Sequence, residues 1–334
     1  MRNIVFLLLS SLVVLFVGCS SYNHPRRINH SEWSSQVRQV PFSKWSNIVH
    51  RGLGVGFVRP EDRETNPYRR PPTDQFQIQP GDAFTTLLIL NTGYDEAYPV
   101  LVSVFLDYRQ VSFSLDGHQG FLHRLDIPPG VTMEIPFQVS IEKAGWHDLF
   151  VVAFREPENR PTDPQDRLPP SLGVGGRRTV VCAGDCTRPN SLLPDRFVGE
   201  DVSAHRTDIN AFPLLPEDGR SPKQRLLLVA NAKPGEDFSL ILWARNPDNQ
   251  SRDYVVLPML NFYQVSFAGS EVLHLHMPAG SELFIPGQIR LPDEEGVHEL
   301  QFLIVFEPYH PLDEVRDPFV VSDMRSALVV EPGE

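Results

Sequence analysis

The sequence predicts an all-β protein built from two tandem β-sandwich domains that follow a short leading segment. The chain has 31 prolines among its 334 residues, and 41% of its residues are apolar. Proline-rich turns between short apolar runs are typical of sandwiches. A long internal repeat, described next, sets the number of domains at two. We therefore expect helix to be a minor component.

The repeat is clearest in the motif Gln-Val-Ser-Phe, which occupies residues 110–113 and 264–267, a separation of 264 − 110 = 154 residues. Pro80-Gly81-Asp82 matches Pro234-Gly235-Glu236 at the same separation. Apolar residues between these blocks also match: Phe84, Leu88, Leu106 and Tyr108 pair with Phe238, Leu242, Leu260 and Phe262. The chain therefore contains two related domains.

The repeat and the composition suggest boundaries for each part of the chain. We expect a signal peptide over residues 1–18, a polar tether over 19–50, domain one over 51–183, a connector over 184–206 and domain two over 207–334.

The chain begins with the pattern of an export signal. Arg2 is followed by an apolar run that ends in Phe16-Val17-Gly18-Cys19. The run is shorter than the roughly 20 apolar residues that a spanning helix needs. Its last four residues resemble the lipobox of bacterial lipoproteins, although family members usually have leucine in place of Phe16. The resemblance implies that Cys19 becomes diacylated and N-terminal. The alternative is an ordinary secretory signal with an incidental cysteine.

A lipid at Cys19 would hold the chain on a membrane without a spanning segment, because each buried methylene group of an acyl chain contributes about 0.8 kcal/mol. The rest of the chain would then be extracytoplasmic. Ser20 rather than Asp follows the cysteine, so the resemblance to Gram-negative lipoproteins leaves both the cell membrane and the outer membrane open. The polar tether is expected to be a flexible spacer, unless Trp33 and Trp45 pack on domain one.

Two runs in domain one, residues 84–90 and 100–108, are expected strands. In the second run Val100, Val102 and Val104 share one phase, while Ser103 and Asp107 share the other. This alternation is typical of a strand with one face on a core. Domain two keeps the phase over residues 254–262, where Pro258 indicates an edge strand or a bulge.

Further matched blocks complete the repeat. Pro128-Pro129-Gly130 matches Pro278-Ala279-Gly280 at a separation of 280 − 130 = 150, so domain one has four extra residues, which we assign to a variable loop at 114–122. Residues 145–149 match 296–300, and residues 178–181 match 325–328. Each domain therefore has a full set of short strands at the spacing of a sandwich.

These turns and strands resemble a known family. Pro80-Gly81-Asp82, Asn91-Thr92-Gly93, Pro129-Gly130 and Gly145, with apolar strands between them, are similar to the immunoglobulin-like modules of bacterial surface proteins named CARDB, the cell-adhesion-related domain of bacteria. The resemblance covers about residues 76–155 and implies an immunoglobulin-like sandwich. Domain two departs from it at Asn246-Pro247-Asp248. These motifs are turn chemistry and imply no particular ligand.

Charge limits the classes of partner. The formal net charge is −12, and loss of Arg2 with the signal peptide would make it −12 − 1 = −13. An acidic surface repels phosphate backbones and anionic lipid headgroups. Nucleic acid is therefore not an expected partner.

Two histidines, His274 and His276, are weak candidates for a metal site. His147 and His298 match between the domains, and residues present in both copies are expected to serve the shared fold, here by hydrogen bonding. His274 and His276 would project from one face of a strand, which could begin a metal site but lacks a third ligand. Arg124 holds the position that matches His274, which favours a solvated face.

Cys182 and Cys186 have no counterpart in domain two. Outside the cytoplasm two neighbouring thiols usually form a disulfide, which we expect here. A loop this short would contribute only modest stability. Metal binding or redox use of the pair is the alternative.

No catalytic motif is present: the chain has no nucleophile elbow, phosphate-binding loop or metalloprotease helix signature. We expect no enzyme activity and no cofactor. The expected function is that of a membrane-anchored envelope lipoprotein, a non-catalytic binding or structural module for protein or glycan partners. Two alternatives stay open: an accessory subunit of a membrane protein complex, or a metal or redox protein that uses Cys182 and Cys186.

Overall fold

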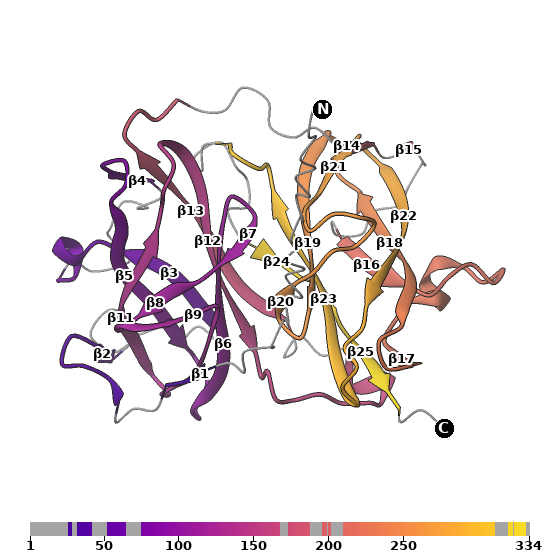
Figure 1. Cartoon of the computed structure of the whole chain (residues 1–334), viewed down its shortest axis with the longest axis horizontal. Coiled ribbons are helices and arrows are strands. Elements are labelled where there is room, and N and C mark those ends of the chain that lie inside the picture. Colours follow the sequence, from indigo (N-terminus) through magenta and orange to yellow (C-terminus); the bar gives the residue numbers. More distant parts are fainter. Residues whose placement is uncertain are drawn as a thin grey trace, which may run out of the picture.

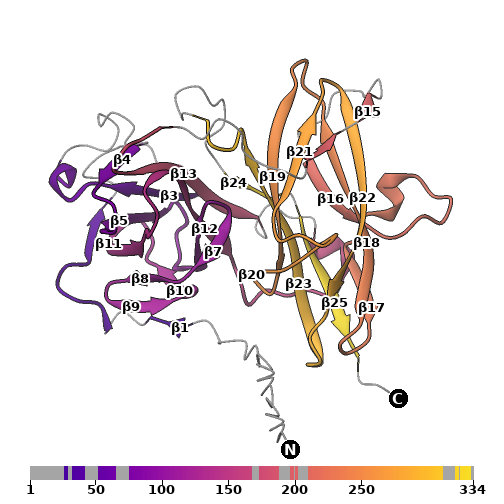
Figure 2. The ribbon, with the colours of Figure 1, turned by 45° about the horizontal axis from the view of Figure 1, so that its top comes forward.

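Two immunoglobulin-like β-sandwiches lie side by side in the chain, which confirms the predicted fold class (Figures 1 and 2). The computed structural model describes residues 26–28, 32–41, 52–64, 75–167, 173–187, 196–198, 200–201, 210–310, 320–322 and 324–331. Each sandwich consists of two sheets, named A and B in domain one and C and D in domain two.

The strands of domain one belong to two mainly antiparallel sheets. Sheet A has the spatial order β1 (Arg26–Arg27), β10 (Leu122–Ile127), β6 (Tyr98–Leu106), β12 (Gly145–Arg155), β13 (Val174–Ala183) and β4 (Gln75–Ile78), with β7 (Arg109–Val111) paired to β6. Sheet B has the order β3 (Leu53–Val58), β5 (Ala83–Thr92), β11 (Val131–Ser140), β8 (Phe113–Leu115) and β9 (His118–Gly120), with β2 (Arg38–Pro41) paired to β11. Short 3-10 turns occur at η3 (Pro60–Asp62) and η5 (Pro164–Arg167).

Domain two repeats this plan. Sheet C has the order β14 (Arg196–Val198), β21 (Leu273–Met277), β19 (Arg252–Leu260), β23 (Gly296–Phe306), β25 (Arg325–Val330) and β17 (Val229–Ala232), with β20 (Tyr263–Gln264) paired to β19 and β24 (Val320–Val321) paired to β23. Sheet D has the order β15 (Glu200–Asp201), β22 (Ser281–Arg290), β18 (Asp237–Asn246) and β16 (Asn210–Leu214). The turn η7 covers Pro222–Arg225.

Each sandwich encloses its own apolar core. The alternating residues predicted to face inward do so: Val100, Val102 and Val104 are fully buried between sheets A and B. Leu273, Leu275 and Met277 are likewise buried between sheets C and D, with the two histidines of β21 in the opposite phase. Burial of these side chains, at about 25 cal/mol per Å² of apolar surface, drives formation of the sheets.

Residues 26–41, which we expected to belong to a flexible tether, instead contribute β1 and β2 to domain one. Strand β1 pairs with β10 in sheet A, and β2 then pairs with β11 in sheet B. Trp33 packs against the core of domain one, whereas Trp45 lies outside the described residues. The polar composition of this segment favoured a solvated tether. Its charge is instead used within the fold: Arg38 of β2 pairs at 2.8 Å with the carboxylate of Glu134, a residue only 2% exposed.

The predicted connector also contains strands. Strand β14 pairs with β21 in sheet C, and β15 pairs with β22 in sheet D. This is the arrangement of β1 and β2 in domain one, so each sandwich begins with a segment that pairs first with one sheet and then with the other. The repeat therefore extends further towards the N-terminal end of each domain than the sequence matches indicated.

The predicted variable loop at 114–122 is a hairpin. Its strands β8 and β9 pair with each other, and β8 pairs with β11 at Phe137 and Gln138. In domain two the same place holds only a turn, closed by a bridge between Phe267 and Ser270. The four extra residues of domain one thus extend the edge of sheet B.

Sheets A and C pack face to face, so β6 and β12 lie beside β19 and β23 at the centre of the molecule (Figure 1). The alternation predicted that one face of β6 lies on a core. The other face is buried as well, since Leu101 and Phe105 in the second phase pack against domain two. The shared cluster consists of Leu101, Phe105, Tyr108, Leu122, Phe150, Val152, Phe154, Val255, Leu257, Met259, Phe262, Leu303 and Val305.

The expected edge strand or bulge at Pro258 corresponds to a local gap. Strand β19 as a whole lies between β21 and β23, and Pro258 pairs with Phe302 of β23. On the other side, pairing with β21 ends at Val256 and pairing with β20 begins at Met259, so Pro258 lies where the ladder is interrupted and proline is tolerated.

Candidate binding site at the domain interface

The repeated glutamines form the centre of the interface. The backbone N–H of Gln110 donates to Oε1 of Gln264 at 2.7 Å, and the backbone N–H of Gln264 donates to Oε1 of Gln110 at 2.9 Å. Each side-chain amide then donates to a turn carbonyl of the other domain, Gln110 to Phe262 at 3.0 Å and Gln264 to Tyr108 at 2.8 Å. The two domains are thus joined by four reciprocal hydrogen bonds around a pseudo-twofold axis.

The glutamines are presented by two-residue hairpin turns, Asp107–Tyr108 and Asn261–Phe262. Both central residues of each turn have positive φ, 48° and 67° in domain one and 50° and 69° in domain two. This is the pattern of a type I′ hairpin, whose twist matches that of its strands. An aromatic residue at positive φ is uncommon, and here both aromatics insert into the cluster between the sheets.

A histidine forms a hydrogen bond with the first central residue of each turn, which agrees with the predicted hydrogen-bonding role of His147 and His298. His147 donates from Nδ1 to Asp107 at 2.7 Å and from Nε2 to the carbonyl of Lys143 at 2.8 Å. Both partners of the ring are acceptors, so the geometry suits the doubly protonated form, and the bond to Asp107 raises the pKa of His147. His298 instead accepts a hydrogen bond at Nδ1 from Nδ2 of Asn261 at 2.7 Å. The equivalent contact in domain two therefore needs no proton on Nδ1 of the ring.

Two matched arginines cross the interface in opposite directions. Arg178 donates to the carbonyls of Phe306, Glu307 and His310 at 3.1, 2.7 and 3.0 Å. Arg325 makes the equivalent contacts with the carbonyls of Arg155, Glu156 and Asn159. Each guanidinium fork therefore caps the turn that follows the last long strand of the other sandwich.

A buried carboxylate accompanies each arginine. Asp148 lies 3.4 Å from Arg178 and accepts from the backbone N–H of Tyr309 at 2.7 Å, and burial raises its pKa. Glu299 lies 3.0 Å from Arg325 and 2.5 Å from Arg167, which comes from η5 of domain one. Charged groups this deeply buried are retained only when paired, so the interface is specific as well as apolar.

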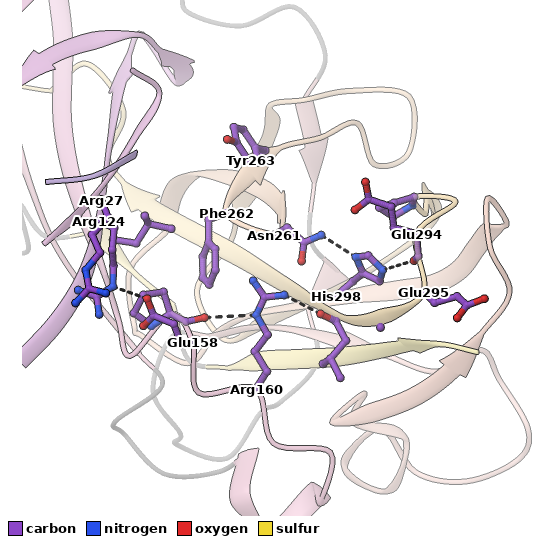
Figure 3. A pocket seen from close by; sticks show the side chains of 15 residues that line it. Arg27, Arg124, Glu158, Arg160, Asn261, Phe262, Tyr263, Glu294, Glu295 and His298 are labelled. Carbon is purple, nitrogen blue, oxygen red and sulfur yellow. Dashed lines mark hydrogen bonds and ion pairs between the residues drawn. The ribbon is translucent and has the colours of Figure 1, made fainter. Parts of the chain in front are cut away.

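A cleft of about 550 Å³ opens between the domains on one side of this interface (Figure 3). Domain one contributes β1, β10 and the loop after β12, and domain two contributes the turn after β19 and the turn before β23. Its lining residues include Arg27, Leu101, Arg124, Glu158, Arg160, Asn261, Phe262, Tyr263, Glu294, Glu295, Val297 and His298. The volume lies within the range of ligand pockets, about 300–1,000 Å³.

The cleft exists because the two halves of the interface differ. Trp146 and Tyr309 match Val297 and Glu158, at the separation of 151 residues that relates Gly145 to Gly296. On the closed side Tyr309 packs edge-on against Tyr108 at 5.0 Å, and Trp146 donates to Asp148 at 3.3 Å. Smaller or flexible side chains at the matching positions leave the other side open. The cleft therefore opens where the two copies differ in sequence.

The structure separates most sequence candidates from this cleft. Cys182 and Cys186 form a disulfide with Cα atoms 5.1 Å apart, next to Gln75 at the far edge of sheet A. His276 pairs with Asp253 at 2.8 Å, and His274 is 8% exposed. Within the described residues, no group of three His, Cys, Asp or Glu side chains is placed to hold a metal ion. Cys19 lies outside the described residues.

Sequence reasoning missed Arg27, Arg160 and Glu294, as well as the interface itself. Nothing in the local sequence distinguishes these three residues from ordinary surface charges. A signal for the interface was present, because Leu101 and Phe105 make both phases of β6 apolar, as expected for a strand buried on two faces. No helix in the described part of the chain is long and apolar enough to span a membrane.

No known family model matches the chain, and neither does any curated protein sequence. Similar solved structures include native Escherichia coli α2-macroglobulin, at 10% identity and TM-score 0.27, over 84% of this chain and 17% of that one. Red sea bream transglutaminase is 9% identical, with TM-score 0.22, over 87% and 33%. The C-terminal domain of the Streptococcus pyogenes antigen I/II-family protein AspA is 8% identical, with TM-score 0.23, over 85% and 100%. The chain thus spans about a sixth of the macroglobulin, and no functional inference rests on these similarities.

Proposed function

We propose that this protein is a lipid-anchored, non-catalytic binding module of the bacterial envelope, which offers the cleft between its two domains to a protein or glycan partner. The observation that carries the proposal is the asymmetry of the interface. Two sandwiches are locked together by matched contacts, and the cleft opens where Val297 and Glu158 stand in place of the matching Trp146 and Tyr309. A locked scaffold holds a binding cleft in one shape, so the partner does not have to order it.

The anchoring part of the proposal rests on the lipobox-like residues Phe16-Val17-Gly18-Cys19. Expression of the full chain with a labelled palmitate analogue should label the protein and place it in the membrane fraction. Cys19→Ser should lose the label, while Cys186→Ser should keep it. Label retained in Cys19→Ser would contradict the assignment.

The binding part is tested at Tyr263, which lines the cleft and is half-buried. A photoreactive phenylalanine analogue at this position, in the full chain within its own host, should give a discrete cross-linked adduct. The matched control places the analogue at Lys223, an exposed residue of η7 away from the cleft. Equal adducts from both positions, or none from Tyr263, would argue against the cleft.

Extraction in mild detergent then distinguishes a binding module from an accessory subunit. A binding module should release its partner on dilution. Recovery of a stoichiometric complex that survives purification would favour the accessory subunit instead.

A further inference from the structure

We infer that the cleft binds a short peptide segment that carries both an acidic and a basic group, an inference that rests on the proposed binding function. The two walls of the cleft have opposite charge. Domain one presents the guanidinium groups of Arg27, Arg124 and Arg160 beside one carboxylate, Glu158, whereas domain two lines the cleft with Glu294 and Glu295, the second of which points away from domain one (Figure 3). A ligand that spans the cleft therefore meets positive charge at one end and negative charge at the other.

The charges of domain one differ in how far they are already neutralised. Arg124 is paired with Asp126 at 2.7 Å and with Glu158, and its pKa is raised, against the effect of burial, by these bonds. Arg27 contacts Asp126 at 3.1 Å, but 62% of its side chain is exposed. Arg160 donates only to carbonyl oxygens, including that of Val297 at 2.9 Å, and pairs with no carboxylate among the described residues. Arg160 is thus the cation best placed to take a ligand carboxylate.

The charges of domain two are not neutralised within the described part of the chain. Glu294 and Glu295 are exposed, and their carboxylates form no ion pair with any described residue. The backbone carbonyl of Glu294 accepts from His298, so the turn that carries both acids is fixed. A fixed turn lowers the entropic cost of pairing a ligand cation.

The floor of the cleft is apolar. Phe262 is 3% exposed, packs against Phe154 at 5.0 Å and lies beside Leu101 and Tyr263. An apolar floor between two charged walls suits a peptide, whose side chains carry charge at both ends of an uncharged backbone. A neutral sugar would cover the same floor but leave the guanidinium and carboxylate groups without ionic partners, which is unfavourable once water is displaced.

The inference is tested with the full chain in detergent, labelled with 3-fluorotyrosine at Tyr263 and observed by fluorine NMR. The probes are capped tetrapeptides Asp-Gly-Gly-Lys, Lys-Gly-Gly-Lys and Asp-Gly-Gly-Asp, together with the neutral glycan chitotetraose. Asp-Gly-Gly-Lys should bind about tenfold more tightly than either same-charge peptide, the effect of two ion pairs of the strength found at partly exposed sites.

Charge reversal provides matched variants. Arg160→Glu replaces the cation of domain one that has no carboxylate partner among the described residues with an acid, while Arg27 and Arg124 remain, and should shift the preference towards Lys-Gly-Gly-Lys. Glu294→Lys should shift the preference towards Asp-Gly-Gly-Asp. The double variant exchanges the two charges, so it should again prefer Asp-Gly-Gly-Lys, bound with its two ends exchanged. Both residues are exposed, so the variants should fold, which far-ultraviolet circular dichroism checks.

The outcomes separate this inference from the proposed function. Binding of chitotetraose alone would overturn the peptide inference and leave a binding module. Equal binding of all three peptides, or unchanged preference in both variants, would also overturn it. Peptide binding without any cross-linked partner in the host would support the ligand chemistry and count against the function.

Discussion

At the scale of single residues, the two domains offer a natural comparison between a histidine bonded to a carboxylate and one bonded to an amide. His147 faces the carboxylate of Asp107, whereas His298 faces the amide of Asn261, in otherwise equivalent turns. The raised pKa of His147 means that its charged form stabilises the fold. This stabilisation is complete below the pKa of an unfolded histidine, about 6.5, and is lost as the pH rises through the raised value.

Asp107→Asn should therefore make domain one resemble domain two. Histidine NMR should show a lower pKa for His147 in the variant. The variant should be less stable than the wild type by about 1 kcal/mol at pH 6, and the difference should shrink towards pH 9. A difference in the free energy of unfolding that stays constant with pH would exclude a charged His147.

Each of the reciprocal glutamines should contribute separately to the contact between the domains. Gln110→Ala or Gln264→Ala should each cost about 1–3 kcal/mol, because each leaves part-buried backbone groups of the other domain without a partner. The partners of each side chain are backbone atoms that alanine retains, so the two costs should add in the double variant. A double-mutant cycle measures this, and a second substitution that cost much less than the first would contradict the arrangement.

At the scale of elements, the turns after β12 and β23 depend on an arginine from the opposite domain. Their first residues, Glu156 and Glu307, have positive φ of 43° and 46°, an uncommon conformation for glutamate. The carbonyl oxygens of these turns accept from Arg325 and Arg178. Neither turn is therefore a property of its own sandwich alone.

Arg178→Met should cost about 3–5 kcal/mol, because it leaves Asp148 buried without a cation. Chemical denaturation of the full chain provides the measurement. The double variant Arg178→Met with Asp148→Asn should recover part of the loss, since it removes the unpaired charge. If the double variant were as unstable as the sum of the two single variants, the carboxylate would not be the cause.

The repeat and the strand phases predicted most of the fold, and their failures have a common physical cause. Turn residues such as Pro80 and Gly81 report local conformation, so they identified the sandwich. The contacts between domains instead join residues about 154 positions apart, such as Gln110 and Gln264, and no local pattern encodes such a contact. The cleft could not be predicted for the same reason, since Arg160, in the loop after β12, bonds to Val297 of β23 only once the two domains are packed together.

At the scale of the whole molecule, the shared cluster between sheets A and C should make the two domains unfold together. Calorimetry of the wild type should show one transition. Leu257→Asp would place a charge in the cluster and should split unfolding into two transitions, whereas Ser239→Asp on the exposed face of sheet D should not. A single transition that persists in Leu257→Asp would mean that the domains are coupled by other contacts.

The doubled contacts of the interface also bear on how this chain can change over generations. The glutamine contacts and the arginine contacts each occur twice around the pseudo-twofold axis, so loss of one member leaves its counterpart in place. One side can then accumulate substitutions that would separate a protein held by a single set of contacts. The difference between Trp146 and Tyr309 on one side and Val297 and Glu158 on the other is of this kind. Duplication thus supplies a tolerant half in which new binding specificity can arise while the other half maintains the assembly.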